Sequence, residues 1–166
     1  RYWEHLSEEV PAVAQSFFRL SGRRDDTFVA GLSMGGYGAM KWALHQPERF
    51  AAAASRSGAL DLATRQGSGG LRPDLADAAV GGREIAGSDD DLLAVLERRV
   101  TSSADLPALY VCCGTDDDLL DESQRFLDTA DRLGVDVTRD LGPGAHEWSY
   151  WDRQVQQVLG WLPLAR

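Results

Sequence analysis

Short continuous runs of apolar residues alternate along the chain with longer stretches in which apolar residues recur at helical spacing. The short runs predict strands covered on both faces, and the spaced residues predict amphipathic helices that pack on a sheet. The predicted strands cover residues 27–30, 50–55, 106–113 and 135–141. The helical spacing covers residues 8–18, 39–44, 92–100, 119–133 and 151–162. This alternation predicts a single α/β domain over residues 1–166, with a mainly parallel sheet and helices on both faces.

Capping residues predict where several of these helices begin or end. Ser7 can accept hydrogen bonds from the first amides of one helix, and Ser88, with Asp91 three residues later, is typical of a second helix start. Gly134 can end the helix that precedes it. Residues 60–87 are rich in Gly, Ala and Asp and have little periodic pattern, which predicts a surface excursion or lid.

Composition and charge indicate which kinds of molecule the protein is poorly suited to bind. The 166 residues include 26 acidic and 17 basic side chains, for a formal charge of -9. Because the cations are scattered, nucleic acid and anionic membrane surfaces are poor partners. No run reaches the roughly 18 apolar residues of a membrane span.

The cysteine pattern bears weakly on the compartment. Cys112 and Cys113 are neighbours in a predicted strand, where their side chains point to opposite faces and cannot easily bridge each other. Reduced core thiols favour a cytoplasmic protein. The chain opens on Arg1 rather than Met, so a signal peptide on an upstream segment stays open.

The clearest chemical motif runs from Gly31 to Gly35 and has the pattern G-x-S-x-G between a predicted strand and a predicted helix. In such a turn, glycines flanking the serine let strand and helix approach each other, and the serine hydroxyl is lifted clear of the sheet. We expect Ser33 to be a nucleophile and the Met34 amide, at a helix N-terminus, to donate to a developing oxyanion. The alternative is a glycine-rich turn with a capping serine.

A serine nucleophile needs a general base that a carboxylate orients, and in this fold the acid and then the histidine follow the serine along the chain. His146 lies on a loop after the last predicted strand, whereas His5 and His45 lie before or within helices. We therefore expect His146 to be the base. The acid is one of the aspartates at 116–118, and the residues alone leave the choice open because any of them could instead cap the next helix.

The sequence contains no recognisable motif for binding a cofactor. There is no P-loop, no dinucleotide-binding glycine motif and no Cys/His cluster with zinc spacing, so no cofactor is implied. The aromatic residues beside His146, Trp148 among them, could line an acyl pocket or could be core residues at the start of an amphipathic helix.

Four motifs follow one another along the chain. They are Gly31-Leu32-Ser33-Met34-Gly35-Gly36-Tyr37-Gly38-Ala39, Pro47-Glu48-Arg49-Phe50, Cys113-Gly114-Thr115-Asp116-Asp117 and Gly144-Ala145-His146-Glu147-Trp148. Together they resemble the Putative esterase family of α/β hydrolases, nearest to its tributyrin-esterase-like branch. That family includes S-formylglutathione hydrolases, feruloyl and acetylxylan esterases, and mycolyltransferases. The resemblance implies the α/β-hydrolase fold, carries the triad acid to Asp117 by the pattern C-G-T-x-D, and carries the base to His146 by the pattern G-x-H-x-W.

Two features depart from this family. Its members normally have a further N-terminal segment with the first strands and a loop that donates the second oxyanion-hole amide, whereas no strand and glycine-rich loop precede the helix predicted near Ser7. We expect the sheet to lack its N-terminal strands, the second donor to come from outside residues 1–166, and an apolar sheet edge to favour a homo-oligomer. Residues 67–70 are unlike a strongly patterned lid, so substrate preference does not carry over.

The sequence thus predicts a serine hydrolase that cleaves small or short-chain carboxylic esters through an acyl-enzyme, with Ser33, Asp117 and His146 as the triad. Its partner would be a small-molecule ester. Two alternatives remain at this point: an acyltransferase of the same family, in which an alcohol resolves the acyl-enzyme, and a truncated, non-catalytic binding domain.

Overall fold

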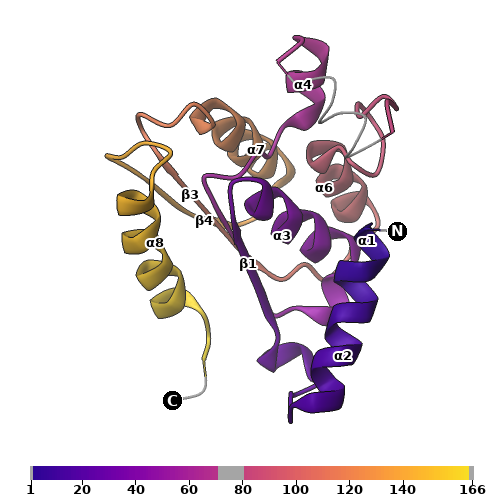
Figure 1. Cartoon of the computed structure of the whole chain (residues 1–166). Coiled ribbons are helices and arrows are strands. Elements are labelled where there is room, and N and C mark those ends of the chain that lie inside the picture. Colours follow the sequence, from indigo (N-terminus) through magenta and orange to yellow (C-terminus); the bar gives the residue numbers. More distant parts are fainter. Residues whose placement is uncertain (1, 71–80, 165–166) are drawn as a thin grey trace.

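The computed structural model describes residues 2–70 and 81–164, which form one sheet flanked by helices (Figure 1). The strands are β1 (Phe28–Leu32), β2 (Ala52–Arg56), β3 (Ala108–Gly114) and β4 (Val137–Gly142). They are all parallel, and their order across the sheet is their order in the chain. The predicted strands and the parallel sheet are confirmed, with small shifts at the strand ends.

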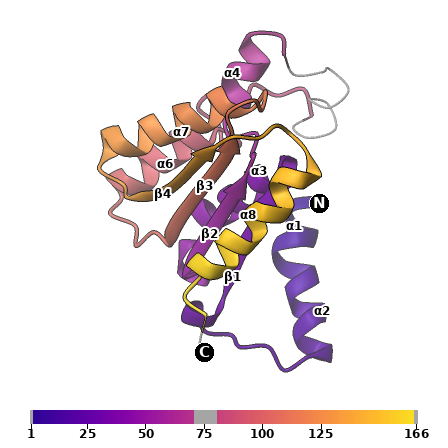
Figure 2. The same cartoon turned by 90° about the vertical axis from the view of Figure 1, so that its left-hand side faces the viewer.

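Helices cover both faces of this sheet, as predicted (Figures 1 and 2). The larger apolar cluster joins one face of the sheet to α3 (Met34–His45), α6 (Leu92–Thr101) and α7 (Leu120–Leu133). α8 (Trp148–Trp161) lies on the other face, where its Val158 shares a second cluster with Tyr110 and Cys112 of β3. Right-handed crossovers between successive parallel strands explain why α3, α6 and α7 share a side.

The N-terminal helix begins earlier than the sequence predicted. Helical turns start with α1 (Tyr2–Glu4), continue through a π-helical segment η1 (His5–Glu9), and end with α2 (Val10–Phe17). The prediction that Ser7 caps this helix is wrong, because Ser7 lies within it and is buried. Its carbonyl accepts a hydrogen bond from Arg49 at 2.7 Å, in the short 3-10 turn η3 (Pro47–Arg49). A second 3-10 turn, η2 (Arg24–Asp26), leads into β1.

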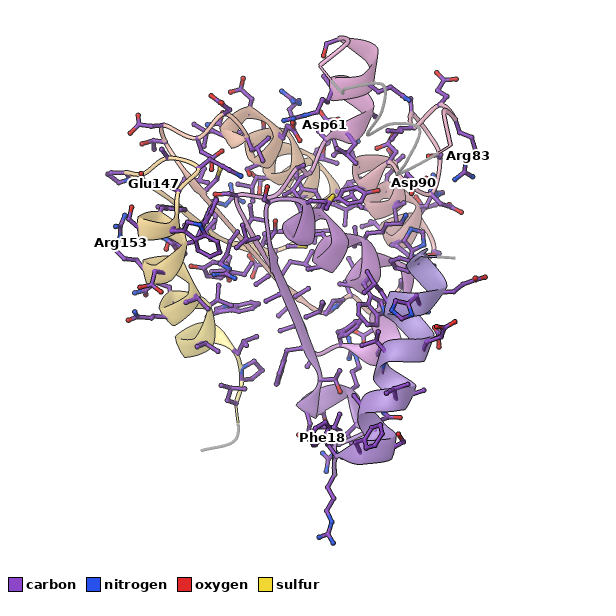
Figure 3. All side chains as sticks on the ribbon, in the orientation of Figure 1. Phe18, Asp61, Arg83, Asp90, Glu147 and Arg153 are labelled. Carbon is purple, nitrogen blue, oxygen red and sulfur yellow. The ribbon has the colours of Figure 1, made fainter. Side chains whose placement is uncertain are left out.

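Large apolar side chains are exposed on α2 and on the segment that follows it. They are Val10, Val13, Phe17, Phe18 and Leu20. In Figure 3, Phe18 lies at the far end of α2, away from the carboxyl ends of the strands. The homo-oligomer expected from the sequence stays a prediction, as does the second oxyanion donor from outside residues 1–166.

The described parts of the predicted excursion, residues 60–70 and 81–87, are fixed to the core at both ends. Leu60, Asp61 and Ile85 are buried. Asp61 caps the short helix α4 (Leu62–Gly67) and forms an ion pair with Arg125 of α7. The middle of the excursion, 71–80, lies outside the described residues, so its role as a lid stays a prediction.

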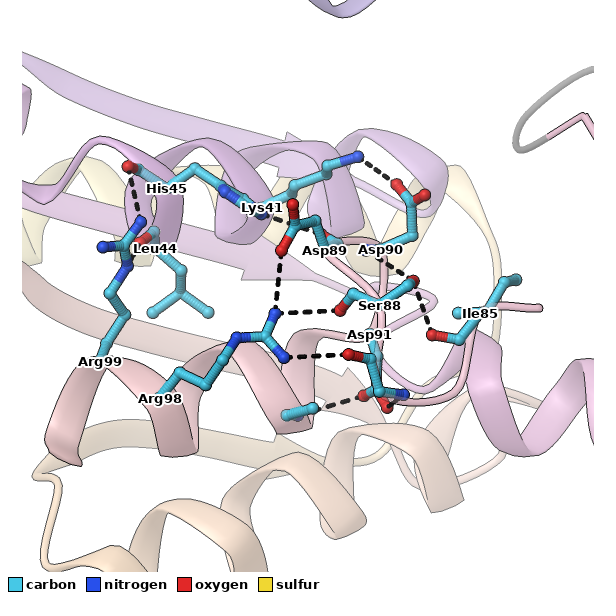
Figure 4. Close-up of polar contacts among 12 residues, drawn as sticks. Lys41, Leu44, His45, Ile85, Ser88, Asp89, Asp90, Asp91, Arg98 and Arg99 are labelled. Carbon is cyan, nitrogen blue, oxygen red and sulfur yellow. Dashed lines mark hydrogen bonds and ion pairs between the residues drawn. The ribbon is translucent and has the colours of Figure 1, made fainter. Parts of the chain in front are cut away.

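The loop that leads into α6 is held by a polar network between α3 and α6 (Figure 4). Lys41 of α3 pairs with Asp90, and the His45 ring bonds to the Asp89 carbonyl at 2.8 Å. The helix start predicted at Ser88 is wrong in register. Asp91 is the capping residue, and its carboxylate accepts from the amide of Ala94 at 3.2 Å. The cap therefore lies three residues after Ser88, and the helix begins at Leu92.

Candidate active site

The turn between β1 and α3 holds Ser33 in an unusual backbone conformation. Its φ is 55° and its ψ is -121°, a conformation that costs a non-glycine residue of order 1–3 kcal/mol and is found mostly at functional sites. The Ser33 amide donates to the Arg56 carbonyl at 2.9 Å, which ties the turn to β2. The strained turn is therefore held in place by the adjacent strand β2.

Close backbone approach explains two glycines around this turn. A Cβ at Gly31 would overlap the Gly35 carbonyl, and a Cβ at Gly36 would lie 2.6 Å from the Ser55 hydroxyl and 2.9 Å from Gly58. The same argument, made from the sequence for both flanking glycines, is wrong for Gly35, where no atom would lie within 4 Å of an added Cβ. The close packing is therefore at Gly31 in β1 and at Gly36 in α3.

The loop after β3 buries the carboxylate of Asp117. Its side chain is 0% exposed, and Oδ1 accepts from the Leu119 amide at 2.9 Å. From the sequence we expected one aspartate of the run to face the histidine and another to cap α7. Asp117 is the one that faces His146. The expected cap is wrong, because Asp116 and Asp118 are exposed and α7 has no side-chain cap.

The loop that carries His146 is packed directly on the loop that carries Asp117. The Thr115 amide donates to the Gly142 carbonyl and the Asp116 amide to the Gly144 carbonyl, each at 2.9 Å. A Cβ at Gly114 would overlap the Gly144 backbone. These contacts set the distance between the two loops.

Three side chains from separate loops meet at the carboxyl ends of the strands. His146 Nε2 lies 3.0 Å from Ser33 Oγ, and His146 Nδ1 lies 2.9 Å from Asp117 Oδ2. The His146 side chain is 35% exposed, so a reactant can reach it. A hydroxyl bonded to an imidazole whose other nitrogen faces a buried carboxylate is the arrangement that makes a serine nucleophilic.

The other two residues expected at this site are the first residues of their helices. Met34 opens α3 and Trp148 opens α8, and their exposed fractions are 78% and 75%. Trp148 contacts Trp151 edge to face, with ring centroids 5.3 Å apart. In Figure 3 the neighbouring Glu147 lies at the end of α8 toward the loops that follow the strands. Trp148 is therefore a solvent-facing residue at the site rather than a core residue.

Sequence reasoning missed Ser57, which lies just beyond β2. Its side chain is buried, and its hydroxyl accepts from Trp151 Nε1 at 3.1 Å. Its positive φ of 46° is visible only in the structure, and the surrounding sequence contains no motif that marks this residue.

The two cysteines are buried and unpaired with each other, as the sequence suggested. Burial raises the pKa of the Cys113 thiol to about 11, and the neighbouring Asp117 carboxylate acts in the same direction. Cys113 is therefore a neutral thiol at neutral pH. Cys113 therefore places no second negative charge beside the carboxylate of Asp117.

Over residues 2–70 and 81–164, no group of three or more His, Cys, Asp or Glu side chains is arranged to hold a metal ion. Within the same residues, no helix combines the length and the apolar character needed to cross a membrane.

Residues 1–162 match the profile of the Putative esterase family. The chain belongs to this family. The membership confirms the resemblance carried by the four motifs, and with it the α/β-hydrolase fold, which solved relatives share.

Three relatives show how much of the family domain the chain spans. An acetyl esterase of Caldicellulosiruptor saccharolyticus is 26% identical over 171 residues, which is 97% of this chain and 63% of that protein. FphF, a fluorophosphonate-binding serine hydrolase of Staphylococcus aureus, is 32% identical with a TM-score of 0.86 over 95% of this chain and 62% of that one. An S-formylglutathione hydrolase of the same organism has the same identity and TM-score, over 97% of this chain and 63% of that one. The chain thus spans somewhat less than two thirds of these relatives.

Proposed function

We propose that this chain carries the nucleophile, base and acid of a serine esterase that cleaves carboxylic esters through an acyl-enzyme. The observation that carries the proposal is the continuous contact from Ser33 through His146 to the buried carboxylate of Asp117. Membership in an esterase family and the likeness to serine hydrolases support it.

In the first half of the reaction, Ser33 Oγ attacks the ester carbonyl and gives its proton to His146 Nε2. The tetrahedral intermediate collapses as His146 protonates the leaving alcohol, and the acyl group stays on Ser33. In the second half, His146 removes a proton from water as that water attacks the acyl carbonyl. When the second tetrahedral intermediate collapses, the bond to Ser33 Oγ breaks, His146 returns the proton to Ser33 Oγ, and a carboxylic acid is released. Asp117 holds the imidazole in the tautomer that both halves require and stabilises the imidazolium.

The Met34 amide is the oxyanion donor in this proposal, because it follows the nucleophile at the N-terminus of α3. We place the acyl group or the leaving alcohol against the exposed ring of Trp148. Short-chain esters are the substrate class we favour, supported by the acetyl esterase among the relatives.

The test is turnover of p-nitrophenyl acetate and butyrate by the chain and by its Ser33→Ala variant. The proposal expects turnover that Ser33→Ala abolishes and that Ser102→Ala, an exposed serine at the end of α6, leaves intact. Turnover that survives Ser33→Ala would place the nucleophile elsewhere. Absence of turnover in the unmodified chain, together with ester binding, would instead favour a non-catalytic binding domain. Trp148→Ala should raise KM, because it removes the exposed ring that contacts the substrate in this proposal, and it should leave the triad contacts in place.

A further inference from the structure

The imidazole of His146 is held at its edges by Ser33 and Asp117, and it also contacts a third side chain. The ring of Trp151 lies against it, with centroids 4.8 Å apart and an angle of 87° between the planes. Two hydrogen bonds at the ring nitrogens fix the direction of the imidazole but leave it free to tilt about the line that joins them. A perpendicular aromatic neighbour restrains that tilt.

Trp151 is itself anchored at two points to the end of β2. Its indole Nε1–H donates to Ser57 Oγ at 3.1 Å, and its carbonyl accepts from Arg56 at 3.1 Å. Ser57 is fully buried, and its amide donates to the Cys112 carbonyl at 2.7 Å. Ser57 follows β2 directly, and this bond ties it to β3.

The surroundings of Trp151 separate it from the apolar core. It is 7% exposed, yet within the described residues it belongs to neither apolar cluster. Its ring contacts are with His146 and Trp148. The Trp151 ring therefore packs beside the catalytic histidine and lies outside both apolar clusters.

We propose that Trp151 is a positioning residue for His146 and that Ser57 holds Trp151 in place through the indole hydrogen bond. The proposal rests on the proposed function, because the rate it predicts is that of Ser33-dependent ester cleavage. Neither residue exchanges a proton or an electron pair with the substrate. Both act by keeping the imidazole aligned with Ser33 Oγ.

Two variants remove the same hydrogen bond from opposite sides. Trp151→Phe keeps an aromatic ring against His146 but deletes the donor, and Ser57→Ala deletes the acceptor. Trp161→Phe is a matched control, since the Trp161 indole also donates to a hydroxyl at 3.1 Å, that of Thr138, at the other end of α8. A general effect of losing an indole hydrogen bond on α8 would affect Trp151 and Trp161 alike.

The rates should separate the two tryptophans. We expect Trp151→Phe and Ser57→Ala each to lower kcat by about 10- to 100-fold with little change in KM, because small misalignments of reacting groups cost about that much. The double variant should be close to either single variant, since both delete one bond. Trp161→Phe should leave kcat unchanged.

A second measurement reports the imidazole without any turnover. The ¹⁵N signals of histidine-labelled protein should show a single His146 tautomer in the unmodified chain and in Trp161→Phe, and a mixture in Trp151→Phe and Ser57→Ala. If Trp151→Phe does not fold, Ser57→Ala carries both measurements alone.

The outcomes distinguish this inference from the proposed function. If the unmodified chain cleaves esters through Ser33 but all three single variants match it in kcat and in the His146 signals, the positioning role is overturned and the esterase proposal stands. If the unmodified chain has no Ser33-dependent turnover, the esterase proposal fails. The inference then stands or falls with the ¹⁵N signals.

Discussion

Gly114, the last residue of β3, lies in direct backbone contact with Gly144, two residues before His146. A Cβ at Gly114 would overlap the Gly144 carbonyl, so no other residue type fits without moving the loop. The loops that carry Asp117 and His146 are therefore spaced by a glycine-to-glycine contact.

This contact predicts the effect of adding one methyl group. Gly114→Ala should push the His146 loop away from Asp117 and lower kcat by about 100-fold. Gly142→Ala is the control on the neighbouring strand, because the nearest atom to its Cβ would be Asp140 Oδ1 at 3.9 Å. It should have nearly unchanged kcat. Equal kcat values for the two variants would show that the glycine contact does not set the geometry of the site.

The register of the acid can be tested with three asparagine variants. Asp117→Asn should cost roughly 10⁴ in kcat, because the amide favours the wrong imidazole tautomer. Asp116→Asn and Asp118→Asn should be close to the unmodified chain, since both side chains are exposed and neither contacts His146. Steady-state kinetics on folded protein decide the matter. Loss of turnover in Asp118→Asn but not in Asp117→Asn would move the acid by one position.

The glycines of the turn and of α3 should respond in opposite directions to alanine. Gly31→Ala should destabilise the fold by at least about 3 kcal/mol, because its Cβ would overlap the backbone of α3. Gly38→Ala should stabilise it by about 0.5–1 kcal/mol, since no atom lies within 4 Å of the added Cβ and glycine is costly inside a helix. Urea unfolding of both variants measures the two changes. A stable Gly31→Ala protein would contradict the close approach of strand and helix.

The carboxylate of Asp61 predicts a pH-dependent contribution to stability. Burial alone would raise its pKa, but hydrogen bonds from Thr64 and Arg125 outweigh burial and hold the pKa below its usual value. A group with a lower pKa in the folded state stabilises the fold above its unfolded pKa of about 3.9, and that stabilisation is lost as the pH falls through the folded value.

Asp61→Asn should therefore lower the free energy of unfolding by about 1–2 kcal/mol at pH 7, and the difference should shrink below about pH 4. Asp131→Asn is the control, because Asp131 pairs with Arg139 at the surface, where ion pairs contribute little. Denaturant unfolding at pH 7, 5 and 3 measures both. A difference for Asp61→Asn that is independent of pH would mean that its ion pair with Arg125 does not stabilise the fold.

The sequence was informative where the signal is local. Strands covered on both faces read as unbroken apolar runs such as 106–113, and the serine turn is a contiguous motif between a strand and a helix. The order of serine, aspartate and histidine along the chain then pointed to Ser33, His146 and the aspartates at 116–118, and the family resemblance selected Asp117. The structure brings these three side chains within hydrogen-bond distance.

The sequence was less informative where two residues can play the same part or where the partner is distant. Ser88 and Asp91 both suit a helix start, and packing of the preceding loop on α3 decides for Asp91. Ser57 carries no local signal, because its partner Trp151 lies 94 residues away. Helix pattern also fails near the first residues, where too few precede Ser7 to show that the helix has already begun.

Reaction with a fluorophosphonate tests most directly whether Ser33 is the nucleophile. After incubation of the folded chain with the reagent, intact-mass spectrometry and peptide mapping give the number and the place of the adducts. We predict one adduct, on Ser33, and none in Ser33→Ala. An adduct on another residue, or no adduct on protein that still cleaves esters, would contradict it.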